Sequence, residues 1–262
     1  MRRYVKIYMG FIRNTLIRDM EFRLNFFVWG IAMTVEMGIH LLFFHNIYGN
    51  IDDIAGYDKY EWFFYLGLVQ LMLAVFMVFV FPNLVSLPWL INGGELDYLL
   101  LKPVNSQFYI SLRNANFGYM VNVPAGIILM IYGSIHMKID ISVWSAASVL
   151  LYSSVGILIL YAILFNLSIL SVWLKKADFA STLFFNLWSF MRYPSDVYGK
   201  VMRIVFTYLL PVLLICTVPM EIILKKVEGI TLLIMLFSCF IWFMGSILLW
   251  KIAVKHYSSA SS

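Results

Sequence analysis

The chain has 262 residues, of which 62% are hydrophobic, 18% aromatic and only 13% charged. Soluble domains carry about 45–50% apolar and about 25% charged residues, so a globule of this size has too small an interior to hide this much apolar surface. The composition and the mean hydropathy of +0.86 exclude a soluble enzyme, a disordered chain and a secreted disulfide scaffold. The net charge of +5 is explained below by membrane topology, so we expect no nucleic-acid partner.

Residues 1–23 predict an amphipathic helix that does not cross the membrane. Six apolar side chains share one helical face, and Asp19 is the exception on that face: the six are Val5, Tyr8, Met9, Ile12, Leu16 and Met20. Basic side chains on the other faces favour a position along the inner leaflet, near anionic lipid head groups. The alternative is a basic leader that only sets the orientation of the chain.

Six stretches are long and apolar enough to cross a bilayer, which takes roughly 20 residues. They lie at about 24–46, 62–85, 114–135, 143–170, 204–221 and 229–250. The apolar runs around the second and fourth are longer than one bilayer, so part of each should continue outside it. Phe179–Met191 is too short to cross and predicts an interfacial or re-entrant helix. We therefore expect an all-α membrane protein with six transmembrane helices, forming one domain over residues 1–262.

Lysine and arginine predict the orientation, because cytoplasmic segments are enriched in both. With the N-terminus inside, fifteen of the 19 lie in cytoplasmic segments, and Arg192, Lys200 and Arg203 are among them. The four in outer segments are Lys59, Lys138, Lys225 and Lys226. Both termini are therefore expected in the cytoplasm.

Motifs for nucleotide, metal or nucleophile chemistry are absent from the sequence. A phosphate-binding loop requires Gly-rich residues followed by Lys-Ser or Lys-Thr, but Pro103 follows Lys102. The sequence also lacks a His-x-x-x-His pair, a Gly-x-Ser-x-Gly elbow and a Cys-x-x-Cys pair. We expect no enzymatic activity and no cofactor or metal in this chain, so any driven process takes its energy from another subunit or from an ion gradient.

Glu36 and His40 are the first candidate site. They are four residues apart on the first expected span and share a helical face. Ionisable groups at that depth face a bundle interior or a watery cavity, so the pair could receive a substrate or carry a proton. The alternative is a polar clamp between helices. Other polar side chains in the spans are candidates for the same path or for interhelical hydrogen bonds: Gln70, Asn116, Asn122 and Asn166.

The segment Ile91–Pro103 is the second candidate. Gly93 and Gly94 precede about two turns of helix, and Pro103 ends them. The acidic residues lie at the N-terminal end and Lys102 at the C-terminal end, as the helix dipole favours. Leu96, Leu99 and Leu100 share a face. Such a face is suited to a groove on a partner protein, and the alternative is a turn packed on its own bundle.

The run Gly94-Glu95-Leu96-Asp97-Tyr98-Leu99-Leu100-Leu101-Lys102-Pro103 resembles the Gly-x-Leu-Asp-x-x-Leu-x-basic-Pro signature of ABC-2 type permeases. More specifically, it is similar to the bacterial permease group related to daunorubicin-resistance and other multidrug ABC exporters. The run Arg192-Tyr193-Pro194, followed by Tyr198, Pro211 and Pro219, resembles that group's Arg-Tyr-Pro segment followed by a proline-containing fifth helix. The resemblance covers essentially the whole chain.

This resemblance implies a permease subunit of an ATP-driven exporter in the bacterial inner membrane. Two cytoplasmic ATPase subunits would bind the ATP and magnesium, and a second permease, identical or paralogous, would complete the transporter. The loop between spans two and three would be the coupling helix that docks on the ATPase through Glu95, Leu96, Asp97, Tyr98, Lys102 and Pro103. The cargo would be an amphipathic small molecule, drug or lipid, and Glu36 suggests a cationic one.

Pro211 and Pro219 fall within the fifth expected span. Each removes a backbone donor and kinks a helix, so this 17-residue apolar run could be broken or partly re-entrant, serving either as a gate or only for packing. Two other function classes stay open. Paired broken helices in two halves of the chain would favour a substrate-capture subunit or secondary carrier, and the sequence shows only one, in the fifth run. An intramembrane enzyme would require clustered acids and histidines near one interface, and Glu36 with His40 alone is too few.

Overall fold

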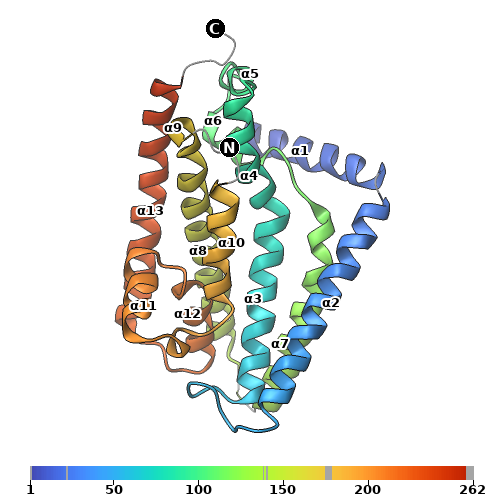
Figure 1. The fold of residues 1–262 in the computed structure, drawn as a ribbon, viewed down its shortest axis with the longest axis vertical. Helices are drawn as coiled ribbons and strands as arrows, with labels where there is room; N and C mark the ends of the chain where they lie inside the picture. The colour runs from blue at the N-terminus through green and yellow to red at the C-terminus, as the bar shows by residue number, and fades with distance from the viewer. Residues whose placement is uncertain (1, 22, 138, 140, 175–178, 258–262) are drawn as a thin grey trace.

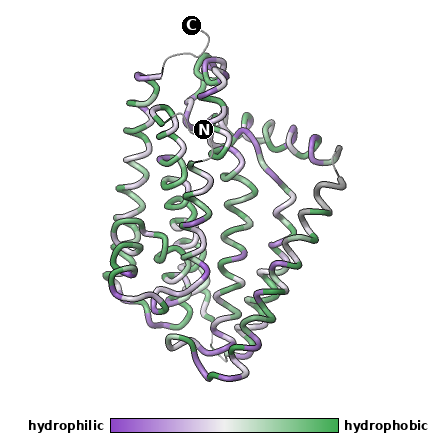
Figure 2. The backbone as a smooth tube through the Cα atoms, in the orientation of Figure 1, coloured by the Kyte–Doolittle hydropathy of each residue, from purple (hydrophilic) through white to green (hydrophobic). Residues whose placement is uncertain are grey.

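The computed structural model describes residues 2–21, 23–137, 139, 141–174 and 179–257, and this part of the chain is helical without a β-strand. Long helices run roughly along the longest axis of the molecule, and α1 (Arg2–Glu21) lies across one end (Figure 1). Hydrophobic residues dominate the middle of the long helices, whereas hydrophilic residues gather toward the two ends (Figure 2). The expected all-α membrane fold is confirmed.

The long helices form two groups around a buried centre. Their bounds are α2 (Arg23–Ile47), α3 (Lys59–Phe79), α7 (Asn122–Met137), α8 (Val143–Ile169) and α13 (Gly229–His256). Both α3 and α8 are mostly buried, whereas only a small share of the described residues of α2, α7 and α13 is buried. Because apolar surface gains little by leaving lipid, membrane helices associate through close packing of small residues. In α3 and α7, a Cβ added to Gly67 would lie 2.7 Å from the carbonyl oxygen of Gly126.

The second predicted span continues beyond its first helix. After Val80 the chain resumes as α4 (Phe81–Asn92), with Pro82 in its first turn, as proline's missing N–H allows. The fully buried side chain of Asn83 stabilises this break by hydrogen bonds to the backbone. Its Nδ2 donates to the carbonyl oxygens of Phe79 at 3.0 Å and Asn114 at 2.7 Å, and its Oδ1 accepts from the Asn114 amide at 2.8 Å.

Several short helices gather at the end of the molecule that carries α1 (Figure 1). They are α5 (Leu96–Leu100), α6 (Ser106–Leu112), η1 (Phe117–Val121) and α9 (Ser171–Leu174). Arg3 Nη2 donates to the carbonyl oxygen of Pro103 at 2.9 Å, and Asp19 accepts from the Phe117 amide at 3.2 Å. Asp19, the exception in the apolar stripe, therefore fastens α1 to η1. The position of α1 on the inner leaflet stays a prediction.

The stretch expected as the fifth span is a bent hairpin. It consists of α11 (Lys200–Ile204), the π-helix η3 (Val205–Leu209) and α12 (Leu214–Ile223), with 98° between the two arms. Both ends lie at the α2–α3 loop, because Arg203 pairs with Asp196 beside Tyr57 and Lys226 Nζ is 5.8 Å from the Tyr57 ring centroid. Its middle reaches halfway along α3, where Cys216 Sγ is 3.7 Å from Met72 Sδ. The hairpin is re-entrant.

The short helix α10 (Phe179–Met191) takes the path expected of the fifth span. It runs antiparallel to α3: Phe184 stacks on Phe76 with ring centroids 5.1 Å apart, and the Tyr65 hydroxyl donates to the Met191 carbonyl oxygen at 2.9 Å. Farther along the chain, Asp196 lies beside Tyr57, at the end of the molecule that carries the α2–α3 loop. The chain crosses here even though α10 is only about 20 Å long, because residues 192–196 complete the path within the protein.

This crossing changes the expected distribution of positive charge. Arg192 lies about halfway along the bundle, and Lys200 and Arg203 lie at the end that carries the α2–α3 loop, so none of the three lies at the α1 end, where the sequence places them. Most other lysines and arginines lie at the α1 end, which keeps the bias toward that end. Lys138, Lys175 and Lys176 fall outside the described residues.

Candidate functional site

A charged cluster lies about halfway along the bundle. Glu36 is eleven residues from the end of α2 at Ile47, or roughly 16 Å along the helix. Gln70 is eleven residues from the start of α3 and therefore lies at a similar depth. Arg192, directly after α10, reaches the same level and meets Glu36 and His40. The pair predicted on one face of α2 therefore has a cationic partner from a helix 156 residues away.

The three side chains form a closed set of hydrogen bonds. Arg192 Nη2 donates to Glu36 Oε1 at 2.8 Å, and Arg192 Nη1 donates to His40 Nε2 at 2.9 Å. Guanidinium has no acceptor, so Nε2 of His40 is the accepting nitrogen and Nδ1 carries the proton. That Nδ1–H donates to the Glu36 carbonyl oxygen at 2.9 Å. The arrangement fixes the histidine tautomer and balances the charge of Glu36.

These residues line a cleft with apolar walls. Gln70 and Trp188 also face it, and the walls are made by six apolar side chains: Met37, Leu41, Leu66, Val69, Leu73 and Leu129. The free space is about 50 Å³, which is enough for a few water molecules. Trp188 is 3% exposed, and its indole N–H has no acceptor in the described part of the chain.

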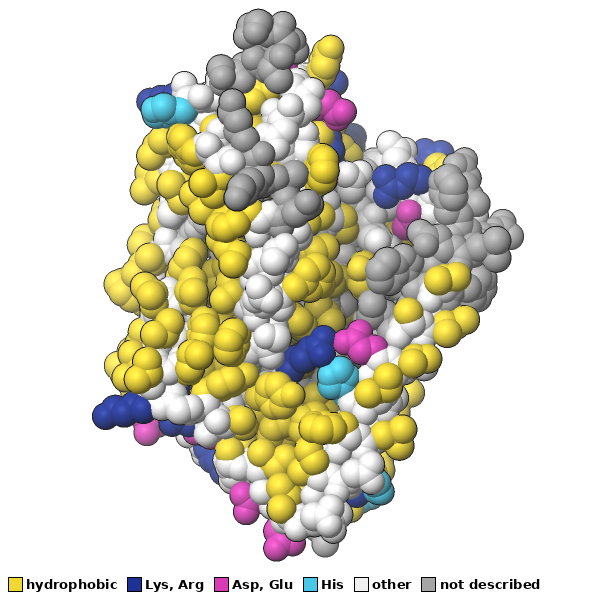
Figure 3. Space-filling view, viewed as in Figure 1, with side chains coloured by type: hydrophobic (Ala, Val, Ile, Leu, Met, Phe, Trp, Pro, Cys, Tyr) yellow, Lys and Arg dark blue, Asp and Glu magenta, His cyan; other side chains and the backbone are white. Residues whose placement is uncertain are grey.

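The cleft opens on the side of the bundle. The side chains of Glu36 and Arg192 are 45% and 34% exposed. Figure 3 shows a basic, an acidic and a histidine side chain meeting between α10 and α2, within a largely hydrophobic face. Charged groups at this depth do not face hydrocarbon. This flank therefore borders water or another protein surface.

The other predicted path residues lie elsewhere. Asn122 is buried at the start of α7, and its Nδ2 has no partner among the described residues. Asn116 caps η1 by accepting from the Gly118 amide at 3.1 Å. Asn166 donates to the Trp242 carbonyl oxygen at 3.4 Å, which joins α8 to α13. Of the predicted polar positions in the spans, Glu36, His40 and Gln70 come together.

In the predicted coupling segment, the leucine face that was expected to meet a partner protein lies against the chain's own bundle. Leu96 and Leu99 are 1% and 7% exposed and pack into the chain's own core, so they are not offered to a partner. The reason is their spacing, which places both on the inner side of the short α5. The outer side presents Tyr98 and Leu101, which are 72% and 81% exposed. Charged and turn residues flank them, and the exposed ones are Glu95, Lys102 and Pro103. Asp97 faces the Tyr257 hydroxyl after α13.

Polar contacts fasten α6, which directly follows this segment, to the long helices. Trp250 Nε1 of α13 donates to Ser106 Oγ at 3.0 Å. Gln107 Nε2 donates to the hydroxyls of Tyr161 in α8 at 3.1 Å and Ser246 in α13 at 3.3 Å. A displacement of residues 95–105 would therefore be transmitted to α8 and α13.

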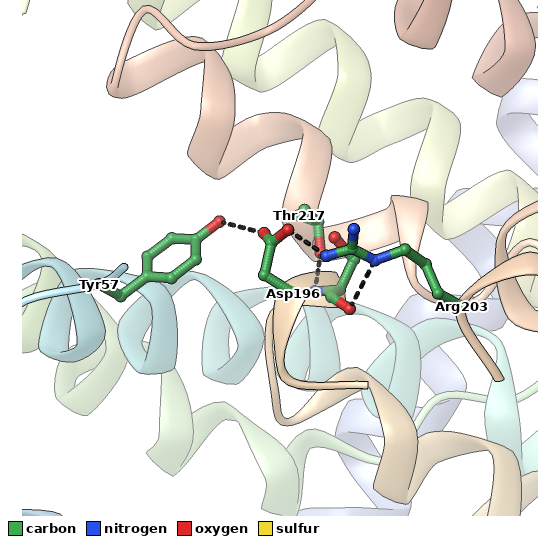
Figure 4. Close-up of polar contacts among 5 residues, drawn as sticks. Tyr57, Asp196, Arg203 and Thr217 are labelled. Atoms are coloured by element: carbon green, nitrogen blue, oxygen red, sulfur yellow. Dashed lines mark hydrogen bonds and ion pairs between the residues drawn. The ribbon is translucent and has the colours of Figure 1, made fainter. Parts of the chain in front are cut away.

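A third polar cluster closes the opposite end (Figure 4). Asp196 pairs with Arg203 and accepts from the Tyr57 hydroxyl at 3.5 Å, and the Ser195 amide donates to Thr217 Oγ1 at 3.2 Å. Burial, with Asp196 nearby, raises the pKa of Tyr57, so its hydroxyl stays protonated and acts as a donor. The cluster joins the α2–α3 loop to the base of the hairpin. Pro211 lies in the break of that hairpin, whereas Pro219 lies inside α12 without interrupting it.

Sequence reasoning missed Arg192, Trp188 and Asn83 as site or support residues. Arg192 was assigned to the cytoplasm because the preceding apolar run is too short for a bilayer. The signal that it belongs in the membrane is the uncompensated acid at Glu36, which requires a cation at the same depth. Trp188 lies four residues before Arg192 and hence on the same helical side, which also points to the cleft.

Comparison with known proteins identifies the family. The family model described as "ABC-2 family transporter protein" matches residues 34–261. No curated protein and no solved structure matches the chain. The matched range includes the charged cleft, the segment 95–103 and the re-entrant hairpin. The chain therefore belongs to the ABC-2 transporter family, as a multi-pass membrane component of an ABC transporter, a class that is generally not enzymatic.

Proposed function

We propose that the protein is the permease subunit of an ATP-driven exporter in a bacterial inner membrane. It moves an amphipathic small molecule, drug or lipid outward. A separate cytoplasmic ABC ATPase, in two copies, binds the ATP and magnesium. A second permease, identical or paralogous, completes the transporter. The family assignment supports the permease role, and the segment 95–103 supports the coupling role.

The observation that carries the coupling role is the exposed pair Tyr98 and Leu101. Tyr98 is 72% exposed at the positively charged end of the molecule, and tyrosine is a typical anchor of a protein interface. Leu101, 81% exposed, extends the apolar surface beside it. Because α6 is hydrogen-bonded to α8 and α13, a push on this pair reaches the membrane helices. The ATPase thus needs to contact only a short turn in order to move the bundle.

The position of the charged cleft supports a route for the cargo along α2 and α10. Glu36 and Arg192 are partly exposed on the flank between α2 and α10, and such groups border water or protein. A second permease seated against this flank would enclose the cleft at the centre of the transporter. The cargo would then pass along α2 and α10, with its polar part beside Arg192 and its apolar part against the leucine-rich walls.

A double substitution tests the coupling role. Tyr98→Ala with Leu101→Ala should abolish co-purification of the ATPase and ATP-dependent export, while the protein stays folded because both side chains are solvent-exposed. Trp144→Ala is the matched control, since Trp144 is 84% exposed at the opposite end and should retain both properties. Unchanged ATPase binding in the double variant would contradict the proposal. Absence of any ATPase from the unaltered protein would favour the secondary-carrier alternative.

A further inference from the structure

The charge balance of the cleft bears on what it binds. An unpaired Glu36 would attract a cation, and the expectation of a cationic cargo rested on that residue. In the structure, however, the Glu36 carboxylate is matched by Arg192 at 2.8 Å. A cation approaching the cleft therefore meets a neutral ion pair, and the Coulomb attraction of a lone carboxylate is lacking.

The remaining hydrogen-bonding capacity of the cleft consists mainly of donors. The bonds to Glu36 and His40 use two of the five N–H groups of Arg192. The indole N–H of Trp188 is buried without an acceptor in the described part of the chain. A buried donor without a partner is unfavourable, and Trp188 is one of the residues that line the cleft, so a ligand oxygen that reached this donor would satisfy it. Gln70 adds an amide that both donates and accepts.

The shape of the cleft limits which part of a ligand enters. About 50 Å³ of free space accommodates a small polar group but no drug-sized body. The walls around it are leucine, methionine and valine side chains, and the cleft opens on the flank between α2 and α10. A head group thus fits inside while an apolar tail lies against the flank.

We propose that the cleft binds the phosphoryl or carboxylate head group of an amphiphile, with Trp188 Nε1–H and the remaining Arg192 donors directed at its oxygen atoms. The ligand is thereby an acidic amphiphile and not an organic cation. This inference rests on the proposed function for its place in transport, whereas the binding itself requires neither ATP nor a partner subunit.

Matched probes with one tail test the head-group preference. Dodecyl phosphate and dodecyltrimethylammonium are titrated separately against the full chain in phosphatidylcholine nanodiscs, and binding is measured by the shift in melting temperature. Dodecyl phosphate should raise the melting temperature in a saturable manner, and dodecyltrimethylammonium should not. Inorganic phosphate should have no effect, because it lacks the tail that contacts the apolar walls. Dipalmitoyl phosphatidic acid distinguishes a membrane lipid from a single-chain acid as the natural ligand class, and a saturable stabilisation by either acid supports the head-group assignment.

Trp188→Phe separates recognition from folding. Phenylalanine keeps one aromatic ring but removes the unpaired donor together with part of the buried indole, so the melting temperature without ligand should fall modestly. Each ligand-induced shift is therefore measured against the ligand-free value of the same variant. The affinity for dodecyl phosphate should fall about tenfold, as expected for loss of a hydrogen bond to a charged group. Trp144→Phe, at an exposed position in the first turn of α8 and outside the cleft, should leave the affinity unchanged.

Three outcomes would overturn the proposal. They are tighter binding of the ammonium probe, equal binding of the two dodecyl probes, and an unaltered dodecyl phosphate affinity in Trp188→Phe. None of these results affects ATPase co-purification or ATP-dependent export, which test the proposed function separately. Conversely, a chain without an ATPase partner would still bind dodecyl phosphate if the head-group assignment is correct.

Discussion

Arg192 connects the charged cluster halfway along the bundle, because it bonds to both Glu36 and His40. Its guanidinium is permanently charged and lies halfway along the bundle, so it requires the carboxylate of Glu36 and the ring nitrogen of His40 at hydrogen-bond distance. Removing one partner of such a pair leaves the other charge uncompensated, which is more costly than removing both. The pair therefore stabilises the contact between α2 and α10 as well as shaping the cleft.

A double-mutant cycle measures this dependence. Glu36→Gln should lower the free energy of unfolding by about 1–2 kcal/mol, the low side of the range for charge pairs because the two side chains are partly exposed. Glu36→Gln combined with Arg192→Gln should be less destabilising than the sum of the two single changes. Chemical denaturation in mixed micelles gives the values. Simple additivity would show that the two charges do not depend on each other.

Asn83 is a second residue with an effect larger than its size suggests. Asn83→Ala leaves the amide and carbonyl of Asn114 without the partners that now satisfy them at 2.8 and 2.7 Å. Unsatisfied buried groups cost about 1–3 kcal/mol, so thermal unfolding should occur at a clearly lower temperature. Asn186→Ala, at an exposed position in α10, is the control, and equal melting temperatures for the two variants would refute the role of Asn83.

At the scale of elements, glycines determine how α3 and α7 meet. A Cβ on Gly126 would lie 2.9 Å from the carbonyl oxygen of Gly67, and one on Gly133 would lie 2.8 Å from the carbonyl oxygen of Tyr60. Both distances are below van der Waals contact with backbone atoms, which have no rotamer by which to move away. The two helices therefore approach more closely than any larger residue at these positions permits.

Gly126→Val should consequently force the two helices apart. Overpacking of this kind costs about 1–3 kcal/mol or more, and we expect a lower yield of monodisperse protein and a lower melting temperature by size-exclusion chromatography and calorimetry. Gly38→Val places the same side chain on α2, where a Cβ meets nothing within 4 Å, and should be tolerated. Similar behaviour of the two variants would mean that the α3–α7 contact is not limiting.

The helices also show which features of the fold can be predicted from the hydropathy pattern and which cannot. Five long apolar helices, the short helix in the loop 95–103 and the shared face of Glu36 and His40 follow from local pattern, and the structure contains each of them. The exchange of roles between 179–191 and 204–221 does not follow, because the longer run is the more convincing span by length alone. What decides the outcome is tertiary: α12 packs against α8 at Gly156, where a Cβ would lie 2.8 Å from Ile215 Cγ2, and α10 fills the remaining space beside α3. The orientation of Leu96 and Leu99 likewise depends on the core beneath them.

For the whole molecule, the re-entrant hairpin predicts which positions face the outside. Lys200→Cys should react with a membrane-impermeant thiol reagent added to intact cells, as should Lys225→Cys, whereas Lys102→Cys should react only after the cells are opened. The background is Cys239→Ser, since Cys216 is fully buried. If residues 204–221 crossed the bilayer instead, Lys200 would be protected in intact cells while Lys225 reacted.

The shortness of α10 has a consequence for biogenesis. Its 13 residues span about two thirds of the hydrocarbon thickness and end at an arginine, so this segment alone is a poor substrate for lateral release from the translocon. The acid that neutralises Arg192 was synthesised 156 residues earlier. Stable insertion of α10 therefore depends on α2 being available as its partner, so we expect these two helices to assemble in the membrane together instead of in chain order.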